Sequence, residues 1–420
     1  MRIKTSLSLL RSSTSNNVLW AILGNLGRVV SQGAYFIILA KTLGVEQFGV
    51  FSSAFALVNV ASPFSMFGSG NLLVMNVARD RDSFDRFFGN CIIFLTISGF
   101  ILLAALLVLA GFILPSTPVL IVLFLGMGEL VFYRLVDIAA QAFQAFENMK
   151  LAANTYLLAS FFRLALSIAF VFIPVHNAVA WSFIYLISNI SVGVFALLYL
   201  TKLAGLPKFD KSLITYTFKN GWAYSLGISA TSIYSDVDKI YLSRFDSLAV
   251  TGYYNAAYRI ILLLITPLQA LVYALNTRMF QSGQNGVSGL IPLLRRILYI
   301  ILIYSLVSFL LLLLFRPLIP KILGAGFSSS SVVVVTMFMI VPLASINYVI
   351  GDVLMGAGYQ KARSVIQIIV AIFASIFGFF VIQKYSWQGG IMTSVCSQSV
   401  LLLSLVIILI HFVLKEKNAL

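Results

Sequence analysis

The sequence predicts an all-α membrane protein that crosses the bilayer many times. Of its 420 residues, 60% are hydrophobic and only 10% are charged, a balance far from that of water-soluble domains. Apolar stretches of about 20 residues, the length that spans a bilayer as a helix, recur from one end of the chain to the other. The polar gaps between them are too short for a separate soluble domain, and a transmembrane barrel would instead show short segments of alternating pattern.

We expect twelve transmembrane helices, each an apolar stretch flanked by charged or turn-forming residues. The first is longer than the core of a signal peptide and no small-residue cleavage site follows it, so we expect it to be retained. The expected ranges are 18–41, 48–75, 88–114, 119–146, 151–173, 178–203, 216–243, 250–277, 293–315, 331–357, 362–384 and 389–414. Helices 88–114, 293–315 and 389–414 carry no charge in their interior, since Arg295 and Arg296 lie at the very start of 293–315, and we expect all three to face lipid.

The distribution of Lys and Arg gives the orientation of these helices. Of the 28 Lys and Arg residues, 18 fall on the side of the membrane that holds the N-terminus, five on the other side and five inside the predicted helices. Cytoplasmic loops are the ones enriched in basic residues. An even number of spans with this bias places both termini in the cytoplasm. The Lys and Arg residues that give the net charge of +15 lie between apolar spans. The positive charge therefore does not indicate nucleic-acid binding.

A polar stripe runs along the predicted helix 216–243. Its members alternate in steps of four and three residues, which places them on one helical face. They are Ser225, Ser229, Ser232, Asp236, Lys239 and Ser243. Because charge in lipid is costly, such a face must contact protein or water. The stripe predicts a water-filled path through a bundle of helices.

Two stretches of the chain repeat each other at a constant offset. Residues 39–57 and 242–260 align a basic residue, a glycine and an aromatic residue, in that order: Lys41 with Arg244, Gly49 with Gly252, and Phe51 with Tyr254. The copies lie six spans apart and therefore have the same orientation in the membrane. This predicts two parallel six-helix halves related by an axis along the membrane normal, with an N-terminal lobe at 1–206 and a C-terminal lobe at 207–420.

The repeated stretches also carry a family resemblance. Leu39–Leu57, Ala142–Leu164 and Asp236–Ile260 resemble the polysaccharide flippases of the multidrug/oligosaccharidyl-lipid/polysaccharide (MOP) exporter superfamily, with the O-antigen flippases as the nearest branch. The closest matches are LGVEQFG at Leu43–Gly49 and GYYNAAY at Gly252–Tyr258. The resemblance implies a V-shaped carrier that works by alternating access in the bacterial inner membrane.

The resemblance also implies the cargo and partners of such a carrier. The cargo is a polyprenyl-diphosphate-linked oligosaccharide, such as the repeat unit of the lipopolysaccharide O-antigen, moved from the cytoplasmic to the outer leaflet. The lipid bilayer is the other partner, together with other membrane proteins of polysaccharide assembly. The family needs no cofactor, and a proton or sodium gradient is a candidate source of energy.

Charged residues inside the predicted helices are the candidate site. Arginine grips phosphate oxygens with paired donors and lysine acts as a point charge, so cations on polar stripes suit a diphosphate. The candidates for substrate binding are Arg28, Arg134, Arg163, Lys239 and Arg259. The candidates for coupling or gating are Asp137, Asp236 and Asp352. Arg28 has no acidic neighbour on its own helix, which favours a cavity role.

Several of these charges also have a structural interpretation. Arg134 and Asp137 are three residues apart on a helix and can neutralise each other, and Arg163 can pair with Asp137. Asp238 can pair at the hairpin between helices 216–243 and 250–277. Glu129 lies off the stripe that holds Arg134, which leaves packing and ion coupling as alternatives for it.

The hairpin between these two helices predicts one specific pair. Its turn centres near Ser247, with Asp236 11 residues before it and Arg259 12 residues after it. At about 1.5 Å of rise per residue the two side chains reach nearly the same depth. We therefore expect Asp236 and Arg259 to face one another, with Lys239 one turn closer to the outer surface.

The sequence carries no signature of an enzyme or a metal centre. It has no phosphate-binding loop, no catalytic triad and no metal-ligand cluster, and its two cysteines, Cys91 and Cys396, are expected to be packing residues. Two alternatives remain open. A cation-coupled multidrug exporter of the same superfamily would favour acidic, aromatic-lined sites over arginines. A membrane glycosyltransferase or polymerase would need larger outer loops than those present.

Overall fold

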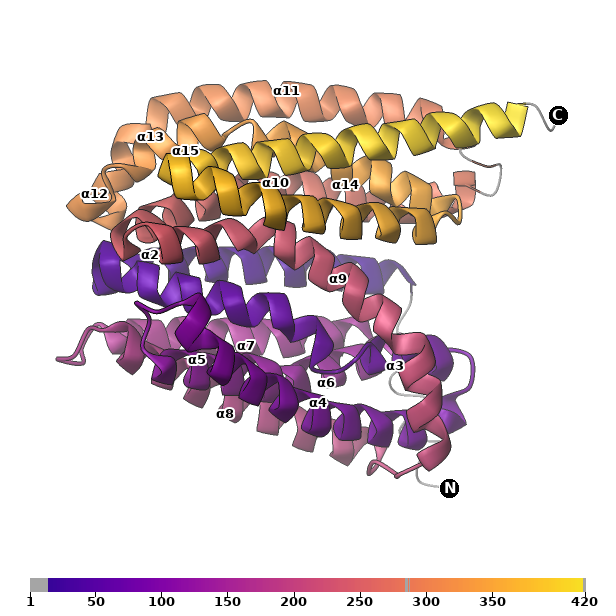
Figure 1. The fold of residues 1–420 in the computed structure, drawn as a ribbon. Helices are drawn as coiled ribbons and strands as arrows, with labels where there is room; N and C mark the ends of the chain where they lie inside the picture. Colours follow the sequence, from indigo (N-terminus) through magenta and orange to yellow (C-terminus); the bar gives the residue numbers. More distant parts are fainter. Residues whose placement is uncertain (1–13, 284–285, 287, 418–420) are drawn as a thin grey trace. The chain divides into compact units, whose positions relative to one another are not determined.

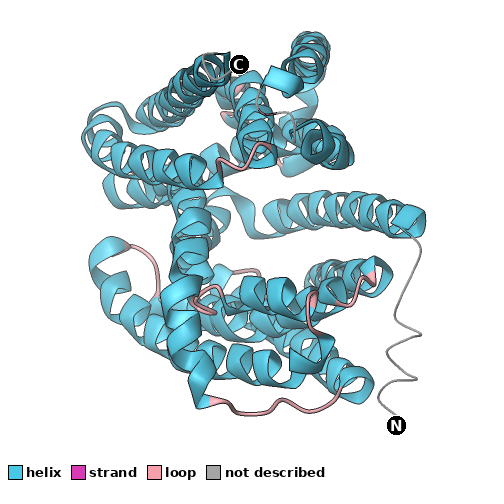
Figure 2. Cartoon of the chain, turned by 90° about the vertical axis from the view of Figure 1, so that its right-hand side faces the viewer, coloured by secondary structure: helices cyan, strands magenta, loops and turns pink. Residues whose placement is uncertain are grey.

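The described part of the chain folds almost entirely into helices. The computed structural model describes residues 14–283, 286 and 288–417, and this part of the chain contains helices and loops but no strand (Figure 2). The helices have the following bounds (Figure 1): α2 Thr14–Ala61, α3 Ser69–Val77, α4 Phe84–Ile113, α5 Val119–Gly126, α6 Tyr133–Ala145, α7 Met149–Phe170, α8 Ala178–Ala204, α9 Lys211–Phe245, α10 Leu248–Gly283, α11 Ile291–Phe315, α12 Ile319–Leu323, α13 Ser330–Met337, α14 Ile340–Gly356 and α15 Gln360–Lys417.

Short helical turns join several of these helices. Five of them are 3-10 turns and one, between α5 and α6, is a π-helical turn. They are η1 Ser62–Phe64, η2 Arg81–Ser83, η3 Met127–Phe132, η4 Ser288–Leu290, η5 Arg316–Leu318 and η6 Ala325–Phe327.

The described helices correspond to the twelve expected segments. Among the described residues, eight helices are long and apolar enough to cross a membrane, and a ninth candidate is the bent pair Ala325–Met337 and Ile340–Gly356. Two of the eight hold two expected segments each, because α2 breaks at Gly44 and α15 at Ser386. The twelfth is α9, which the polar stripe makes less apolar than the others. The chain is an all-α polytopic membrane protein.

Two expected helices are interrupted, in each case near a proline. The expected helix 331–357 bends by 51° between Met337 and Ile340. Pro342 explains this break, because its ring clashes with the carbonyl of Phe338 in a continuous helix. The expected helix 48–75 is interrupted between α2 and α3, where Pro63 begins a turn that ends at Gly68 in the left-handed region (φ 73°).

The chain divides into two compact units. The first comprises Met1–Leu43 and Val50–Ser229, and the second comprises Gly44–Gly49 and Ala230–Leu420. Helix α9 thus begins in the first unit and ends in the second. In the first unit, stacked aromatic residues such as Phe84, Phe88 and Phe146 form the core between α4 and α6.

The linker that leads into α9 is attached to the start of α4 within the first unit. The Lys208 N–H donates to the carbonyl of Asp85 at 2.9 Å, and Arg86 Nε donates to Asp210 at 2.5 Å. The hydroxyl and N–H of Ser212 donate to the same Asp210 carboxylate at 2.7 and 2.9 Å. These hydrogen bonds from Ser212, and then the one from Arg86, hold the pKa of Asp210 below its ordinary value.

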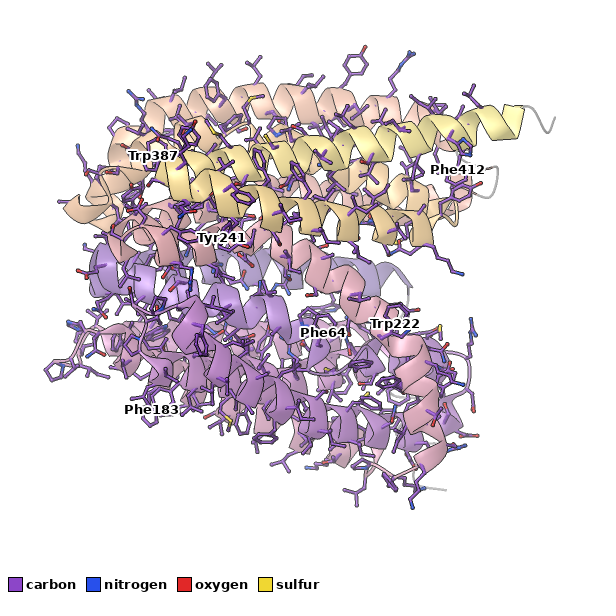
Figure 3. All side chains as sticks on the ribbon, viewed as in Figure 1. Phe64, Phe183, Trp222, Tyr241, Trp387 and Phe412 are labelled. Atoms are coloured by element: carbon purple, nitrogen blue, oxygen red, sulfur yellow. The ribbon has the colours of Figure 1, made fainter. Side chains whose placement is uncertain are left out.

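Apolar side chains cover the outer faces of both units. Phe183 of α8 points away from the helices (Figure 3) and is 49% exposed. Helices α4 and α11, whose charges lie only near their N-terminal ends, expose large apolar residues such as Phe112 and Leu314, at 72% and 68%. Exposed apolar surface of this kind marks contacts with lipid or with another protein, and the expectation that these helices face the bilayer stays a prediction.

The two copies of the sequence repeat meet at their glycines. A Cβ at Gly49 would lie 1.8 Å from the carbonyl oxygen of Leu248, and a Cβ at Gly252 would lie 1.9 Å from that of Val45. The contact is reciprocal, since Val45 and Leu248 are equivalent positions of the repeat just as the two glycines are. A reciprocal contact of equivalent residues is the mark of a two-fold axis. It explains why both copies need glycine at this position.

We expect Gly49→Ala to destabilise the protein by about 1–3 kcal/mol, the usual cost of overpacking. The new methyl group would force the backbone of α10 away from residues 45–49. The measurement is the thermal unfolding midpoint of the purified protein in detergent.

The matched control is Gly111→Ala, because nothing lies within 4 Å of a Cβ at that helical position. Alanine there removes only the helical penalty of glycine and is neutral or slightly stabilising. Equal midpoints for the two variants would contradict a tight backbone contact at Gly49.

Candidate functional site

A buried carboxylate, Glu129, lies on the π-helical turn between α5 and α6. The turn spans Met127–Phe132 and follows an i→i+5 hydrogen-bonding pattern, so it holds one more residue than an α-helical turn. This rotates Glu129 toward Arg134, whose Nε donates to the Glu129 carbonyl at 3.0 Å. Glu129 is only 7% exposed. The π-turn is the reason that Glu129 and Arg134 meet although α-helical spacing places them on different faces.

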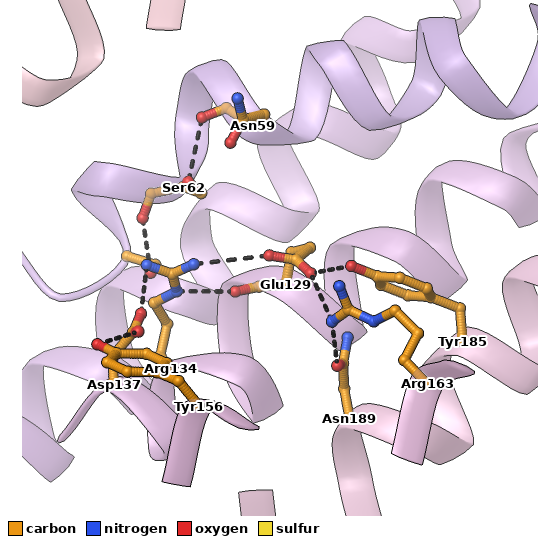
Figure 4. A network of polar contacts seen from close by, with 10 residues as sticks. Asn59, Ser62, Glu129, Arg134, Asp137, Tyr156, Arg163, Tyr185 and Asn189 are labelled. Carbon is orange, nitrogen blue, oxygen red and sulfur yellow. Dashed lines mark hydrogen bonds and ion pairs between the residues drawn. The ribbon is translucent and has the colours of Figure 1, made fainter. Parts of the chain in front are cut away.

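Two arginines share the Glu129 carboxylate (Figure 4). Arg134 Nη2 lies 3.6 Å from Oε2 and Arg163 Nη2 lies 3.8 Å from Oε1. The hydroxyl of Tyr185 on α8 donates to Oε1. Arg163 also donates to Asn189 Oδ1 at 3.0 Å. Glu129 therefore links α6, α7 and α8 through charge inside the first unit.

Asp137 and Tyr156 extend this network on the other side of Arg134. Arg134 Nη1 lies 2.6 Å from Asp137 Oδ2, and the Tyr156 hydroxyl donates to Asp137 Oδ1 at 3.2 Å (Figure 4). The guanidinium of Arg28 on α2 lies over the ring of Tyr156, 5.7 Å from its centroid. The expected pairing of Arg134 with Asp137 is thus confirmed, whereas the ion pair found for Arg163 is with Glu129.

The three arginines of the network outnumber its carboxylates and lie near aromatic rings. They are Arg28, Arg134 and Arg163. Tyr133 lies under both Arg134 and Arg163, at 5.4 and 5.5 Å from ring centroid to guanidinium carbon. Arg163 also lies 4.3 Å from the centroid of Tyr185. Among the residues that the structure describes, Arg28 has no ion pair.

The network leaves several buried N–H donors without an acceptor. They are Arg28 Nε, Arg163 Nε and Asn189 Nδ2. A buried donor without a partner costs about 1–3 kcal/mol. Three arginines face two carboxylates, Glu129 and Asp137, so the network carries an excess of positive charge. An excess of cations and unused donors is the arrangement that accepts an anion rich in oxygen.

The second unit holds a separate charged group around Lys239 on α9. Its ammonium lies 2.9 Å from Asp236 Oδ1 and 3.3 Å from Asp238 Oδ1, donates to the Ser235 carbonyl at 2.5 Å and lies 3.7 Å from the ring centroid of Tyr258. Lys239 is 2% exposed. These contacts enclose the ammonium completely and give Lys239 a structural set of partners.

Asp238 joins three helical segments of the second unit. Tyr254 of α10 donates to its Oδ2 at 2.6 Å, and Ser394 of α15 donates to the same oxygen at 3.0 Å. This matches the structural interpretation of Asp238. Asp352 on α14 pairs with Arg363 on α15 at 2.8 Å. The predicted pairing of Asp236 with Arg259 stays a prediction; the ion pair observed for Asp236 is the one with Lys239.

Sequence reasoning missed parts of the network in the first unit. It identified Arg28, Arg134, Arg163 and Asp137, but not the central role of Glu129 or the part of its partners Tyr185 and Asn189. The cause is the π-turn, which shifts the helical register by one residue. The glycines next to Glu129 could have indicated the close packing of this turn against α8. A Cβ at Gly128 would lie 2.9 Å from Asn189 Nδ2.

The comparisons with known proteins agree with this architecture. A family described as "Polysaccharide biosynthesis protein" matches residues 15–275, more than half of the chain. The chain belongs to this family. No curated protein matches it in sequence.

Solved structures of MOP-superfamily transporters share the fold. One is an inward-facing multidrug resistance MATE family transporter, with a TM-score of 0.73, 14% identity and coverage of 93% of this chain and 98% of that one. The lipid II flippase MurJ in an inward closed conformation matches with a TM-score of 0.73, 16% identity and coverage of 98% and 88%. A MOP superfamily transporter from Pyrococcus furiosus, described as having a binding pocket of reverse polarity, also matches. Its TM-score is 0.67 at 14% identity, and the match covers 96% of this chain and 98% of that one.

By family the chain is therefore a polysaccharide biosynthesis protein, and its fold is that of MOP-superfamily transporters. This agrees with the expectation from the sequence. At identities of 14% and 16%, the similarity to the solved transporters concerns the fold.

We expect Glu129→Gln to destabilise the first unit by roughly 3–5 kcal/mol, because it removes the anion shared by two buried arginines. The measurement is the thermal unfolding midpoint in detergent. The control is Glu46→Gln, since Glu46 is exposed and the substitution is chemically identical. Adding Arg163→Gln to Glu129→Gln should recover part of the loss. Equal midpoints for Glu129→Gln and Glu46→Gln would show that the carboxylate does not hold the network.

Proposed function

We propose that the chain is a flippase that moves a polyprenyl-diphosphate-linked oligosaccharide from the cytoplasmic to the outer leaflet by alternating access. The cargo would be a repeat unit of a bacterial surface polysaccharide, such as the O-antigen. Two facts support the general class: the match to a polysaccharide biosynthesis family and the fold shared with MOP transporters. The MurJ structure with this fold is described as a lipid II flippase, and lipid II is itself a lipid-linked sugar.

The observation that carries the proposal is the unpaired Arg28 beside the Glu129 network. The Nε of Arg28 is buried and donates to no acceptor, and the same is true of the Nε of Arg163. A diphosphate offers several negative oxygens that satisfy such donors, and arginine binds them with two parallel hydrogen bonds. We assign diphosphate binding to Arg28, Arg134 and Arg163, while Lys239 and Arg259 remain candidates of the second unit.

The proposal includes a membrane arrangement. The chain would form a V-shaped carrier of twelve transmembrane helices in two parallel six-helix lobes, 1–206 and 207–420, with both termini in the cytoplasm of a bacterial cell. The reciprocal contact between Gly49 and Gly252 supports a pseudo-two-fold axis between the repeats. The distribution of Lys and Arg supports the orientation.

Coupling to a proton or sodium gradient belongs to the same proposal. Asp137, Asp236 and Asp352 are the candidates, and each lies in an ion pair with a basic neighbour: Arg134, Lys239 and Arg363. Protonation or cation binding at such a carboxylate would release its partner and change the charge available to the cargo.

The excess of arginine weighs against a cation-coupled drug exporter. A site for cationic drugs needs uncompensated carboxylates, whereas in the first unit both Glu129 and Asp137 are already paired with arginine. The observed charge balance favours an anionic cargo.

We expect Arg28→Ala to reduce surface polysaccharide at least tenfold at an unchanged protein level. A hydrogen bond to a charged group contributes about 1.5–3 kcal/mol, so its loss weakens binding roughly 10- to 150-fold. The measurement is surface polysaccharide in cells whose only copy of the gene carries the variant, with membrane protein quantified by immunoblot.

The matched control is Arg79→Ala, because Arg79 is an exposed arginine of the same unit. It should leave polysaccharide at the wild-type level. Normal polysaccharide in the Arg28→Ala strain would remove Arg28 from the diphosphate site.

A further inference from the structure

A polar cavity lies inside the second unit, among α9, α10, α14 and both arms of α15. Its volume of about 110 Å³ has room for roughly eight to ten water molecules, which is also the scale of one sugar ring. Tyr348 on its wall is 38% exposed, so the cavity reaches the surface of the unit. Polar cavities in membrane-spanning bundles are costly, and they mark functional sites.

The lining combines neutral amides with aromatic rings. Gln269, Asn347, Gln367 and Gln398 contribute the amides, one or more from each of three helices. Each amide carries a donor and an acceptor on one planar group, as neighbouring sugar hydroxyls do. The rings of Tyr234, Tyr258 and Tyr348 line the same cavity and offer apolar faces for the C–H groups of a sugar.

One buried group in the lining lacks a partner. Asn347 is 6% exposed, and its Nδ2 donates to the carbonyl and Oε1 of Gln398 at 2.9 and 2.8 Å. Its Oδ1 has no hydrogen-bond partner. An acceptor held in this orientation, with both amide hydrogens used, requires a donor from a molecule in the cavity. A hydroxyl group of a sugar or of water supplies such a donor, and an ionised phosphate oxygen does not.

The charges around the cavity are paired, which favours a neutral ligand. Arg363 is the cation in the lining, and Asp352 neutralises it at 2.8 Å. The Lys239 ammonium behind Tyr258 is held by Asp236 and Asp238. In the part of the chain that the structure describes, no group of three or more His, Cys, Asp or Glu residues could hold a metal ion.

We propose that this cavity is a carbohydrate subsite that receives one neutral sugar ring of the transported oligosaccharide. The inference rests on the proposed function, because the sugar arrives as part of the lipid-linked cargo. It adds a role for the second unit, whose amides and tyrosines bind a sugar hydroxyl face. Asn347 Oδ1 accepts a hydrogen bond from that sugar.

The test compares two probes on the purified full chain. One is the undecaprenyl-diphosphate-linked oligosaccharide extracted from cells that lack this protein, and the other is undecaprenyl diphosphate without sugar. Native mass spectrometry gives both dissociation constants. Several additional hydrogen bonds should make the wild type bind the glycosylated lipid at least tenfold more tightly.

The variants replace a lining glutamine by leucine. Gln367→Leu and, independently, Gln269→Leu should reduce the tenfold preference to twofold or less and leave the affinity for undecaprenyl diphosphate unchanged. Gln383→Leu is the matched control, because Gln383 lies on the same helix as Gln367 but is exposed and outside the lining. It should keep the full preference.

The outcomes separate this inference from the proposed function. If the wild type binds neither lipid, the flippase proposal fails and the subsite with it. If the wild type binds both lipids equally, or both lining variants keep the preference, the sugar subsite is wrong while diphosphate binding stands. Loss of the preference in the Gln383→Leu control as well would equally overturn the assignment to this cavity.

Discussion

The structure depends on the neutralisation of charge inside an apolar helical chain. An unpaired ion in such an interior is costly, so most of the buried charges have partners at short range. In the first unit Glu129 provides them for Arg134 and Arg163 together, and the π-turn that positions Glu129 is the local distortion that makes this possible. The packing of α6, α7 and α8 follows from the same interaction, because the two arginines and Tyr185 lie on those helices.

The two units use polar groups in different ways. The first unit concentrates arginines and leaves N–H donors unsatisfied, which is chemistry for an anion. The second unit encloses Lys239 and Arg363 in ion pairs and lines its cavity with neutral amides, which is chemistry for hydroxyl groups. A lipid-linked oligosaccharide, the proposed cargo, carries both kinds of group, a charged diphosphate and neutral sugars.

The sequence was sufficient to predict the helical membrane fold, the repeat and most of the buried charges, because apolar length and charge alternation are direct consequences of the bilayer. It did not predict the break near Pro342, although proline at that position is a physical reason for one. It also placed Glu129 on the wrong face, since a π-turn changes the register without an obvious signature in composition. The reciprocal approach of Gly49 and Gly252 needed coordinates, because a glycine in a repeat does not reveal which backbone it contacts.

The central claim is that the chain carries an anionic lipid-linked oligosaccharide across a bilayer. The most direct measurement uses the purified protein in vesicles that contain undecaprenyl-diphosphate-linked oligosaccharide, with a membrane-impermeant lectin added outside. If the chain is a flippase, the sugar of lipid molecules that first face the lumen should become accessible to the lectin much faster in vesicles with the protein than in protein-free vesicles. Equal rates in the two vesicle preparations, under an imposed proton or sodium gradient as well as without one, would contradict the account.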